Sequence, residues 1–212
     1  MDSQSSVPAT VREFAKQRNR LVRVLFLWGD ERNVPADHAD SNYRMAREAL
    51  LDHLPISADQ VLPIPTDGGD AYQAATAYEQ TLRARLSNQF NDFGVIDCVL
   101  LGIGDDAHTA SLFPQTDALK ENQRWVVANY VAKLATWRVT LTVPLINSAK
   151  SIAFFIAGAS KTAALQTLWH GPVNHELYPS QMIRPVDGDL TFFVDQAAVN
   201  GLTIPSEFEI VK

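Results

Sequence analysis

The chain has 212 residues, a formal net charge of −6 and 46% hydrophobic side chains. These totals fit one globular domain, 1–212, with a substantial apolar core. The acidic balance argues against a nucleic acid partner, because phosphate backbones are bound by basic patches. It does not exclude a small anionic ligand, since a local cluster of cations is enough to bind one.

Cysteine usage and the N-terminal sequence bear on location. The single cysteine, Cys98, lies in an apolar run and is expected to be a small buried side chain. One cysteine cannot form a disulfide within the chain, which is typical of a reducing compartment. The N-terminal stretch has no basic region followed by an apolar one, so no secretory signal is predicted. No apolar run approaches the roughly 20 residues that span a bilayer. We therefore expect a cytoplasmic protein with no membrane partner.

The first half of the chain is predicted to contain three helices and two strands. The apolar spacing places helices at 11–20, 42–54 and 71–86, and strands at 21–28 and 95–101. Ser41 and Asp70 precede the second and third helices, where their side chains can cap free N–H groups. The run at 95–101 is dominated by apolar residues, which is typical of a strand covered on both faces of a parallel sheet.

The second half continues the alternation. Strands are predicted at 125–131, 138–143, 151–157 and 190–194, with a helix from 159 to about 170 and a short helix near the C-terminus. Strands that alternate with helices in this way predict an α/β fold built on a doubly wound, mainly parallel sheet.

Three predicted strands end in glycine, and charged or polar residues follow each glycine. They are Asp30, Glu31 and Arg32 after Gly29; Asp105, Asp106 and His108 after Gly104; and Ser160 and Lys161 after Gly158. Because the carboxyl ends of parallel strands meet at one edge of a sheet, we expect the three sets to converge there. Together they provide an imidazole, carboxylates and two cations, which suit proton transfer on an anionic, polar substrate.

Each set also has an ordinary structural interpretation. Asp105 and Asp106 are suited to a turn or a helix N-cap. Residues 30–32 are compatible with a solvated turn, and Lys161 with a surface lysine. An Asp-x-His spacing can hold a metal ion, but the sequence offers no second cluster of ligands, so no metal is predicted. A serine hydrolase is disfavoured, because the chain lacks a G-x-S-x-G elbow.

Longer strings resemble one enzyme family. The string DCVLLGIGDDAHTASLFP (97–114) resembles the DGHTASLFP signature of the 6-phosphogluconolactonases, with Ala107 in place of the family's glycine. WGDERNVPADHADSNYRMA (28–46) resembles their WGDER…SNYRMAREALL segment, and GASKTAAL (158–165) their G-x-x-K-x-x-A-L segment. The related glucosamine-6-phosphate deaminases continue with Asn-Glu-Pro where this chain has 111–114, SLFP, which favours the lactonase branch of the glucosamine-6-phosphate isomerase/6-phosphogluconolactonase superfamily.

The resemblance implies a modified Rossmann-like fold and hydrolysis of 6-phosphoglucono-δ-lactone to 6-phosphogluconate in the pentose phosphate pathway, with no cofactor. His108 would be the general base for water, since an imidazole titrates near neutral pH. Asp106 would orient the imidazole. Arg32 would stabilise the oxyanion, and Asp30 would hold Arg32 or the sugar hydroxyls.

Four further residues are assigned to substrate binding. Lys161 matches the family's lysine that contacts the substrate phosphate, and its helix start also favours an anion. Arg138 and Asn42 are binding candidates beside it. Ser6 lies in the segment 3–8, which stands where the family has an SGGSTP phosphate loop. Both glycines of that loop are missing here, and so is the strand that usually precedes it.

Three functions therefore stay open. The favoured one is a lactonase whose phosphate binding is weaker than usual, because side chains at the loop hinder close approach of backbone N–H groups to phosphate. The second is a catalytically impaired or inactive homologue that binds sugar phosphates or a partner. The third is a glucosamine-6-phosphate deaminase, which the sequence after His108 disfavours.

Overall fold

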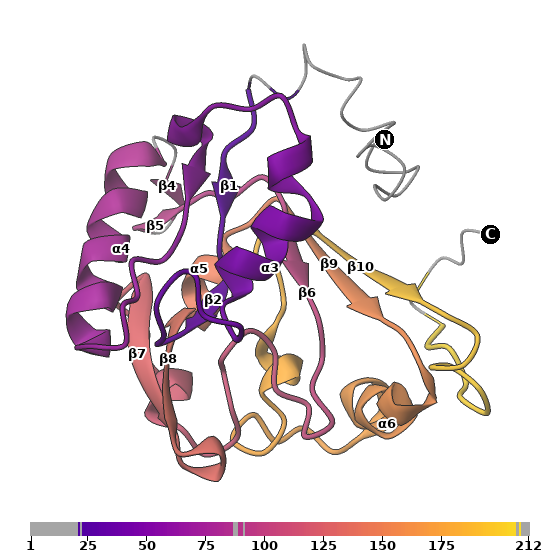
Figure 1. Cartoon of the computed structure of the whole chain (residues 1–212). Coiled ribbons are helices and arrows are strands. Elements are labelled where there is room, and N and C mark those ends of the chain that lie inside the picture. The colour runs from indigo at the N-terminus through magenta and orange to yellow at the C-terminus, as the bar shows by residue number, and fades with distance from the viewer. Residues whose placement is uncertain (1–20, 22, 87–88, 91, 207, 209–212) are drawn as a thin grey trace.

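The computed structural model describes residues 21–206 and 208, apart from 22, 87, 88 and 91. The predicted helix at 11–20 and Ser6 lie outside these residues. Within them, helices and parallel strands alternate along the chain, which confirms the predicted α/β class (Figure 1). None of the described helices is long and apolar enough to cross a lipid bilayer.

Two parallel sheets run through the middle of the molecule. One has the order β10-β9-β6, and the other pairs β1 with β3. These strands are β1 (Phe26–Leu27), β3 (Val61–Leu62), β6 (Val99–Leu101), β9 (Ser151–Ile156) and β10 (Asp189–Val194). Because β6 and β9 are parallel neighbours, the segments that follow them leave the sheet at the same edge. In Figure 1, β6, β9 and β10 are drawn side by side.

Antiparallel pairing makes up the rest of the strand structure. One sheet has the order β2-β8-β7, with β2 at Asp30–Arg32, β7 at Val126–Val131 and β8 at Thr136–Leu141. A short hairpin pairs β4 (Gln89–Phe90) with β5 (Phe93–Gly94). The prediction that residues 30–32 are a polar segment beyond the end of a strand is wrong. They form a strand because β8, distant in sequence, supplies their hydrogen-bond partners.

The described α-helices are α3 (Asn42–Ala49), α4 (Ala71–Arg85), α5 (Val143–Asn147) and α6 (Thr162–His170). α3 and α4 begin where the sequence predicts, but α5 was not predicted, because residue 143 was expected to end a strand. Ser41 and Asp70 accept hydrogen bonds from free N–H groups of α3 and α4, as predicted. α3 is shorter than expected, because the chain tightens into a 3₁₀ turn at Leu51–His53. α4 contacts β7 and β8 and buries Tyr78 and Leu82 completely.

The last part of the chain differs from the prediction. The helix expected from 159 begins as a 3₁₀ turn, Ala159–Lys161, and continues as α6. After β10, residues 195–206 form turns and irregular backbone instead of the expected short helix. Gly201, with a left-handed φ of +78°, and Pro205 both interrupt a helical path there.

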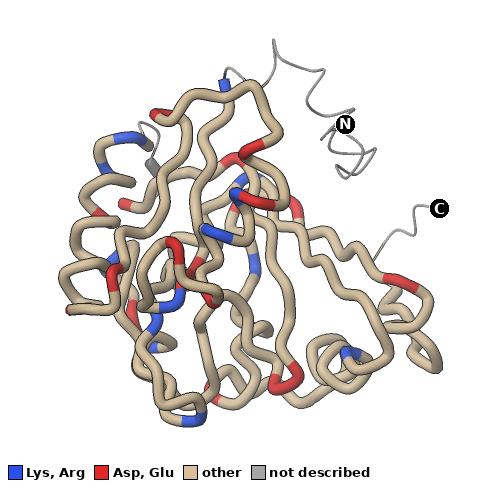
Figure 2. Tube along the Cα trace, in the orientation of Figure 1, with Lys and Arg blue, Asp and Glu red and all other residues tan. Residues whose placement is uncertain are grey.

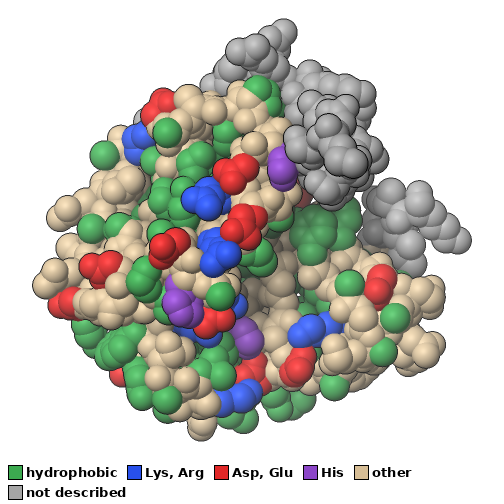
Figure 3. Space-filling view, in the orientation of Figure 1, with side chains coloured by type: hydrophobic (Ala, Val, Ile, Leu, Met, Phe, Trp, Pro, Cys, Tyr) green, Lys and Arg blue, Asp and Glu red, His purple; other side chains and the backbone are tan. Residues whose placement is uncertain are grey.

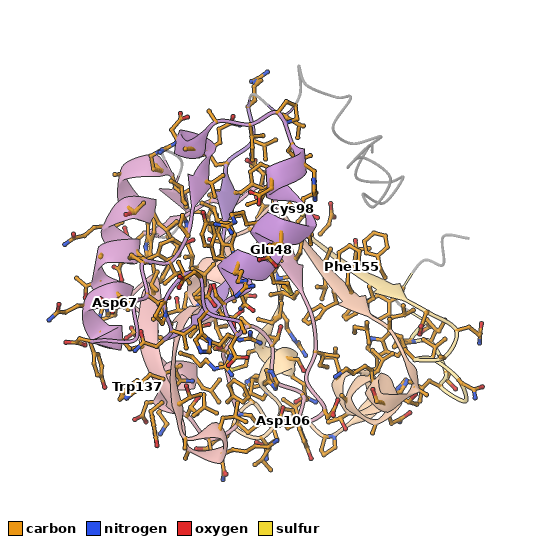
Figure 4. All side chains as sticks on the ribbon, viewed as in Figure 1. Glu48, Asp67, Cys98, Asp106, Trp137 and Phe155 are labelled. Carbon is orange, nitrogen blue, oxygen red and sulfur yellow. The ribbon has the colours of Figure 1, made fainter. Side chains whose placement is uncertain are left out.

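Residues 95–101 do not form the doubly covered strand that their apolar run predicts. Only Val99–Leu101 form β6, and Leu100 is 66% exposed. Cys98, expected to be buried, is exposed at the start of this strand, at the opposite end from Asp106 (Figure 4). Cys98 and Leu100 line a largely apolar groove of about 630 Å³ beside β1. An apolar run alone does not distinguish a doubly covered strand from one that lines such a groove.

The exposed thiol provides a simple check of this part of the fold. We expect Cys98 to react with an aromatic disulfide reagent while the protein is folded, because an exposed thiol is accessible to thiol–disulfide exchange. One thiol per chain should be titrated without denaturant, and the Cys98→Ser variant should release no chromophore. Reaction of the original protein only after unfolding in guanidinium would contradict the exposed position.

Candidate active site

A pocket of about 570 Å³ opens at the carboxyl end of β6. The predicted residues that line it are Asp30, Arg32, Asn42, Asp105, Asp106, His108, Arg138 and Lys161. They come from β2, the start of α3, the loop after β6, strand β8 and the 3₁₀ turn after β9. Figure 3 shows acidic, basic and histidine side chains gathered around the hollowed part of this face. The expected convergence of the three glycine-ended segments is therefore present in the structure.

The loop after β6 folds back against the end of its own strand. The Gly104 N–H donates to the His108 carbonyl at 2.8 Å, and the Thr109 hydroxyl donates to the Gly102 carbonyl at 2.8 Å. A Cβ at position 104 would overlap with the His108 imidazole, so only glycine fits there. Ala107, which stands where the resembling family has glycine, has a left-handed φ of +59°. Glycine adopts this conformation at less cost, so the departure from the family adds strain to the loop.

His108 and Asp106 form a hydrogen-bonded pair. Nδ1 of His108 lies 2.5 Å from Oδ1 of Asp106, and Oδ2 of Asp106 accepts from Lys133 Nζ at 3.0 Å. Partial burial alone would raise the pKa of Asp106, but the hydrogen bonds from His108 and Lys133 lower it to about 2. The imidazole also stacks on Phe113, with ring centroids 4.0 Å apart. With Nδ1 donating to a charged carboxylate, Nε2 is the nitrogen that can accept a proton.

Asp30 is held by a residue that the sequence analysis did not assign to it. Its Oδ2 accepts from the Ser111 hydroxyl at 2.6 Å. Burial raises the pKa of Asp30, while the hydrogen bond from Ser111 and the charges of Arg138 and Arg32 act in the opposite direction. The Ser111 hydroxyl therefore holds the Asp30 side chain in place.

Arg32 and Arg138 are cross-strand partners on β2 and β8. Burial lowers the pKa of Arg138, and the nearby Arg32 guanidinium lowers it further, while Asp30 acts against both. Nη1 of Arg32 donates to the carbonyl of Asp40. The Nε atoms of both arginines are buried and have no hydrogen-bond partner among the described residues. Two adjacent guanidiniums that still have unused N–H donors favour the binding of an anion in this part of the pocket.

Lys161 reaches across to the loop after β6. Its Nζ donates to Oδ1 of Asp105 at 2.6 Å, which joins the segments that follow β6 and β9. This hydrogen bond lowers the pKa of Asp105. Figure 2 marks acidic positions in the loop after β6 and a basic position near the start of α6. An ion pair at an accessible position stabilises the protein only weakly, so the Lys161 ammonium is not committed to Asp105.

Two sequence assignments remain, Asn42 and Ser6, and one lysine near the pocket was not predicted. Asn42 lines the pocket, and its Nδ2 donates to the Asp30 carbonyl at 3.0 Å. Ser6 lies outside the described residues. Lys133 was missed by the sequence analysis, because a lone lysine in the turn between two strands carries no signal. Only the folding of the β7–β8 hairpin brings it to Asp106.

Comparison with known sequences gives one consistent group of relatives. A family profile described as glucosamine-6-phosphate isomerases/6-phosphogluconolactonase matches residues 5–192. The chain is 41% identical over 188 residues to a 6-phosphogluconolactonase of Synechocystis sp., covering 89% of this chain and 77% of that protein. It is 37% identical over 179 residues to a 6-phosphogluconolactonase of Homo sapiens, covering 84% and 68%.

Solved structures agree with the sequence comparison. A 6-phosphogluconolactonase from Trypanosoma cruzi aligns with a TM-score of 0.78 at 32% identity, covering 92% of this chain and 80% of that one. A monomeric glucosamine-6-phosphate deaminase aligns with a TM-score of 0.69 at 20% identity, covering 90% and 81%. At that identity the second likeness shows a shared fold alone.

Proposed function

The chain belongs to the glucosamine-6-phosphate isomerase/6-phosphogluconolactonase family, and from this premise we propose that it hydrolyses 6-phosphoglucono-δ-lactone to 6-phosphogluconate in the pentose phosphate pathway. The observation that carries the proposal is the Asp106–His108 pair at the rim of a pocket lined by two arginines and two lysines. Hydrolysis of a phosphorylated sugar lactone needs both features: a base that takes a proton from the attacking water, and cations that bind the phosphate and the negative oxygen of the intermediate. No cofactor takes part, and the enzyme is expected in the cytoplasm.

The first step is the attack of water on the lactone carbonyl. Nε2 of His108 takes a proton from the water as the new C–O bond forms. Asp106 keeps the proton of the imidazole on Nδ1 and stabilises the imidazolium that results. Lys133 holds the second oxygen of Asp106, so the carboxylate keeps a fixed orientation.

The second step is the collapse of the tetrahedral intermediate. The guanidiniums of Arg32 and Arg138 stabilise the negative oxygen while it exists, because they are already in place before charge develops. The bond to the ring oxygen then breaks, and the imidazolium returns its proton to that oxygen. The products are a free hydroxyl and a carboxylic acid, and the acid releases its proton to solvent to give 6-phosphogluconate. Asp30 partly offsets the repulsion between the two guanidiniums.

Proton release tests the proposal, because hydrolysis converts a neutral ester into an ionised acid. Freshly prepared lactone in weak buffer with a pH indicator should be hydrolysed faster than in the absence of protein, in proportion to protein concentration. Ammonia released from glucosamine 6-phosphate would instead favour the deaminase. Binding of 6-phosphogluconate with hydrolysis at the spontaneous rate would favour an inactive sugar-phosphate-binding homologue.

Lys161 is expected to bind the phosphate, and Lys161→Met should raise the KM for the lactone by about 10-fold or more with a smaller change in kcat. A charged partner that is equally close in the ground and transition states contributes to binding rather than to the chemical step. Steady-state proton release at varied lactone concentration measures both constants.

The chain offers a matched control for this change. Lys150 donates to Asp97 at 2.6 Å, the same distance as the Lys161–Asp105 bond, but it lies outside the pocket. Lys150→Met should leave both constants unchanged. A KM for Lys161→Met equal to that of the original protein would remove Lys161 from phosphate binding.

A further inference from the structure

Glu31 is a buried carboxylate that the proposed mechanism does not use. Its exposed fraction is 1%, and it lies in β2 between Asp30 and Arg32. Because side chains alternate along a strand, it points to the opposite face of β2 from these two pocket residues. Burying a carboxylate is costly unless hydrogen bonds compensate for the lost water.

Four hydrogen bonds satisfy the Glu31 carboxylate. Oε1 accepts from the backbone N–H of Arg32 at 2.8 Å and from that of Asn42 at 2.7 Å. Oε2 accepts from the Ser41 hydroxyl at 3.1 Å and from the backbone N–H of Tyr43 at 2.7 Å. Three of these donors belong to the N-terminus of α3, where unpaired N–H groups and the helix dipole favour a negative charge.

These bonds fasten the start of α3 to β2 at the pocket. Asn42 is the first residue of α3 and lines the pocket, and its side chain returns to the Asp30 carbonyl. Arg32 is held at its own backbone N–H by the same carboxylate oxygen that holds Asn42. One side chain therefore fixes the relative positions of two pocket residues that come from different elements.

We infer that Glu31 is a positioning residue for the hydrolysis: it holds Arg32 and Asn42 in the geometry that the transition state requires, without touching the substrate. The inference rests on the proposed function. A shift of about 1 Å in a group that meets developing charge costs about 10²-fold in rate, so the loss of this clamp acts on the chemical step. Glu31 is thus more than a cap of α3.

Glu31→Gln is the most informative change, because it keeps the shape of the side chain but replaces one of the two accepting oxygens with an NH₂ group. That NH₂ group faces hydrogen-bond donors and cannot accept from them. We expect kcat to fall by about 10-fold or more and KM to change by less than about 3-fold. Glu31→Asp keeps the charge on a shorter side chain and should give a smaller loss of kcat. Proton release measures both, and circular dichroism shows that each variant is folded.

Glu48→Gln is the matched control, since it makes the same change in a glutamate that belongs to α3 itself. Glu48, labelled in Figure 4, is exposed, does not line the pocket and forms an ion pair with Arg44. This variant should keep the kcat and KM of the original protein. A wild-type kcat in both Glu31 variants, with the original protein active, would overturn the inference and leave the proposed function intact. An inactive original protein would overturn both.

A double-mutant cycle distinguishes a positioning role of Glu31 from a general loss of stability. If Glu31→Gln folds poorly, Glu31→Asp takes its place in the cycle. If Glu31 acts through Asn42, its replacement should cost several-fold less in kcat/KM in an Asn42→Ala background than in the original protein. Equal costs in the two backgrounds, together with a lowered melting temperature, would reduce Glu31 to a helix cap and contradict the inference.

Discussion

His108→Ala is expected to lose ~10²–10⁴-fold of the hydrolysis rate, the usual contribution of a positioned general base. The imidazole is held by Asp106 and by stacking on Phe113, so Nε2 can accept the proton of water without a change in the orientation of the ring. Removal of the ring leaves the pocket cations in place, and substrate binding should therefore change much less than kcat. Proton release from fresh lactone, corrected for the spontaneous rate, gives the loss directly.

The matched control is His53→Ala. His53 is exposed, and its Nε2 contacts the Glu48 carbonyl outside the pocket. This variant should hydrolyse the lactone at the rate of the original protein. Hydrolysis by His108→Ala at that same rate would exclude His108 as the base, and the water would then need another acceptor.

The sequence predicted which side chains gather at one pocket better than it predicted the strands that carry them. The rule that polar residues after parallel strands meet at one edge correctly brought His108 and Lys161 together, because they follow the parallel neighbours β6 and β9. Arg32 lines the same pocket from β2, which belongs to a different sheet. The rule needs only the order of strands and glycines. It does not depend on strand length, so the convergence is predicted correctly even though β1 and β6 are shorter than expected.

What the sequence could not predict depends on contacts between distant segments. Residues 30–32 become a strand only because β8 pairs with them, and Ser111 reaches Asp30 only after the loop has folded back. Lys133 reaches Asp106 through a hairpin whose turn is ordinary in sequence. Cys98 is exposed because the apolar run around it lines a groove. In each case the local pattern is compatible with two environments, and tertiary structure decides between them.

Glu31 is a further residue whose environment could not be predicted from the local sequence. In the sequence it is the middle of a charged triplet, and alternation along a strand becomes relevant only when β2 is known to be a strand. The two outer side chains then face the pocket and the inner one faces α3. A motif that is read as one cluster of charges therefore divides into two functions on two faces of the same strand.

Asp106→Asn is expected to lower kcat by about 10²-fold or more, because the amide can donate to Nδ1 and so leave the proton of the imidazole on the wrong nitrogen. It also removes the charge that stabilises the imidazolium and the partner of Lys133. Asp117→Asn is the matched control, since Asp117 is fully exposed and pairs with Lys120. A kcat for Asp106→Asn equal to that of the control would show that the carboxylate is dispensable.

The pH dependence of stability gives an independent test of the same carboxylate. Its pKa is about 2 in the folded protein against an ordinary value of 3.8, so its charge stabilises the fold above pH 3.8, and this contribution is lost as the pH falls toward 2. The original protein should therefore melt at a higher temperature than Asp106→Asn at neutral pH, and the difference should narrow below about pH 4. A difference that is the same at pH 3 and pH 7, measured by circular dichroism, would mean that the His108 and Lys133 contacts do not hold a charged Asp106. The proton on Nδ1 would then lack its anionic partner, and the assignment of Nε2 as the base would lose its physical support.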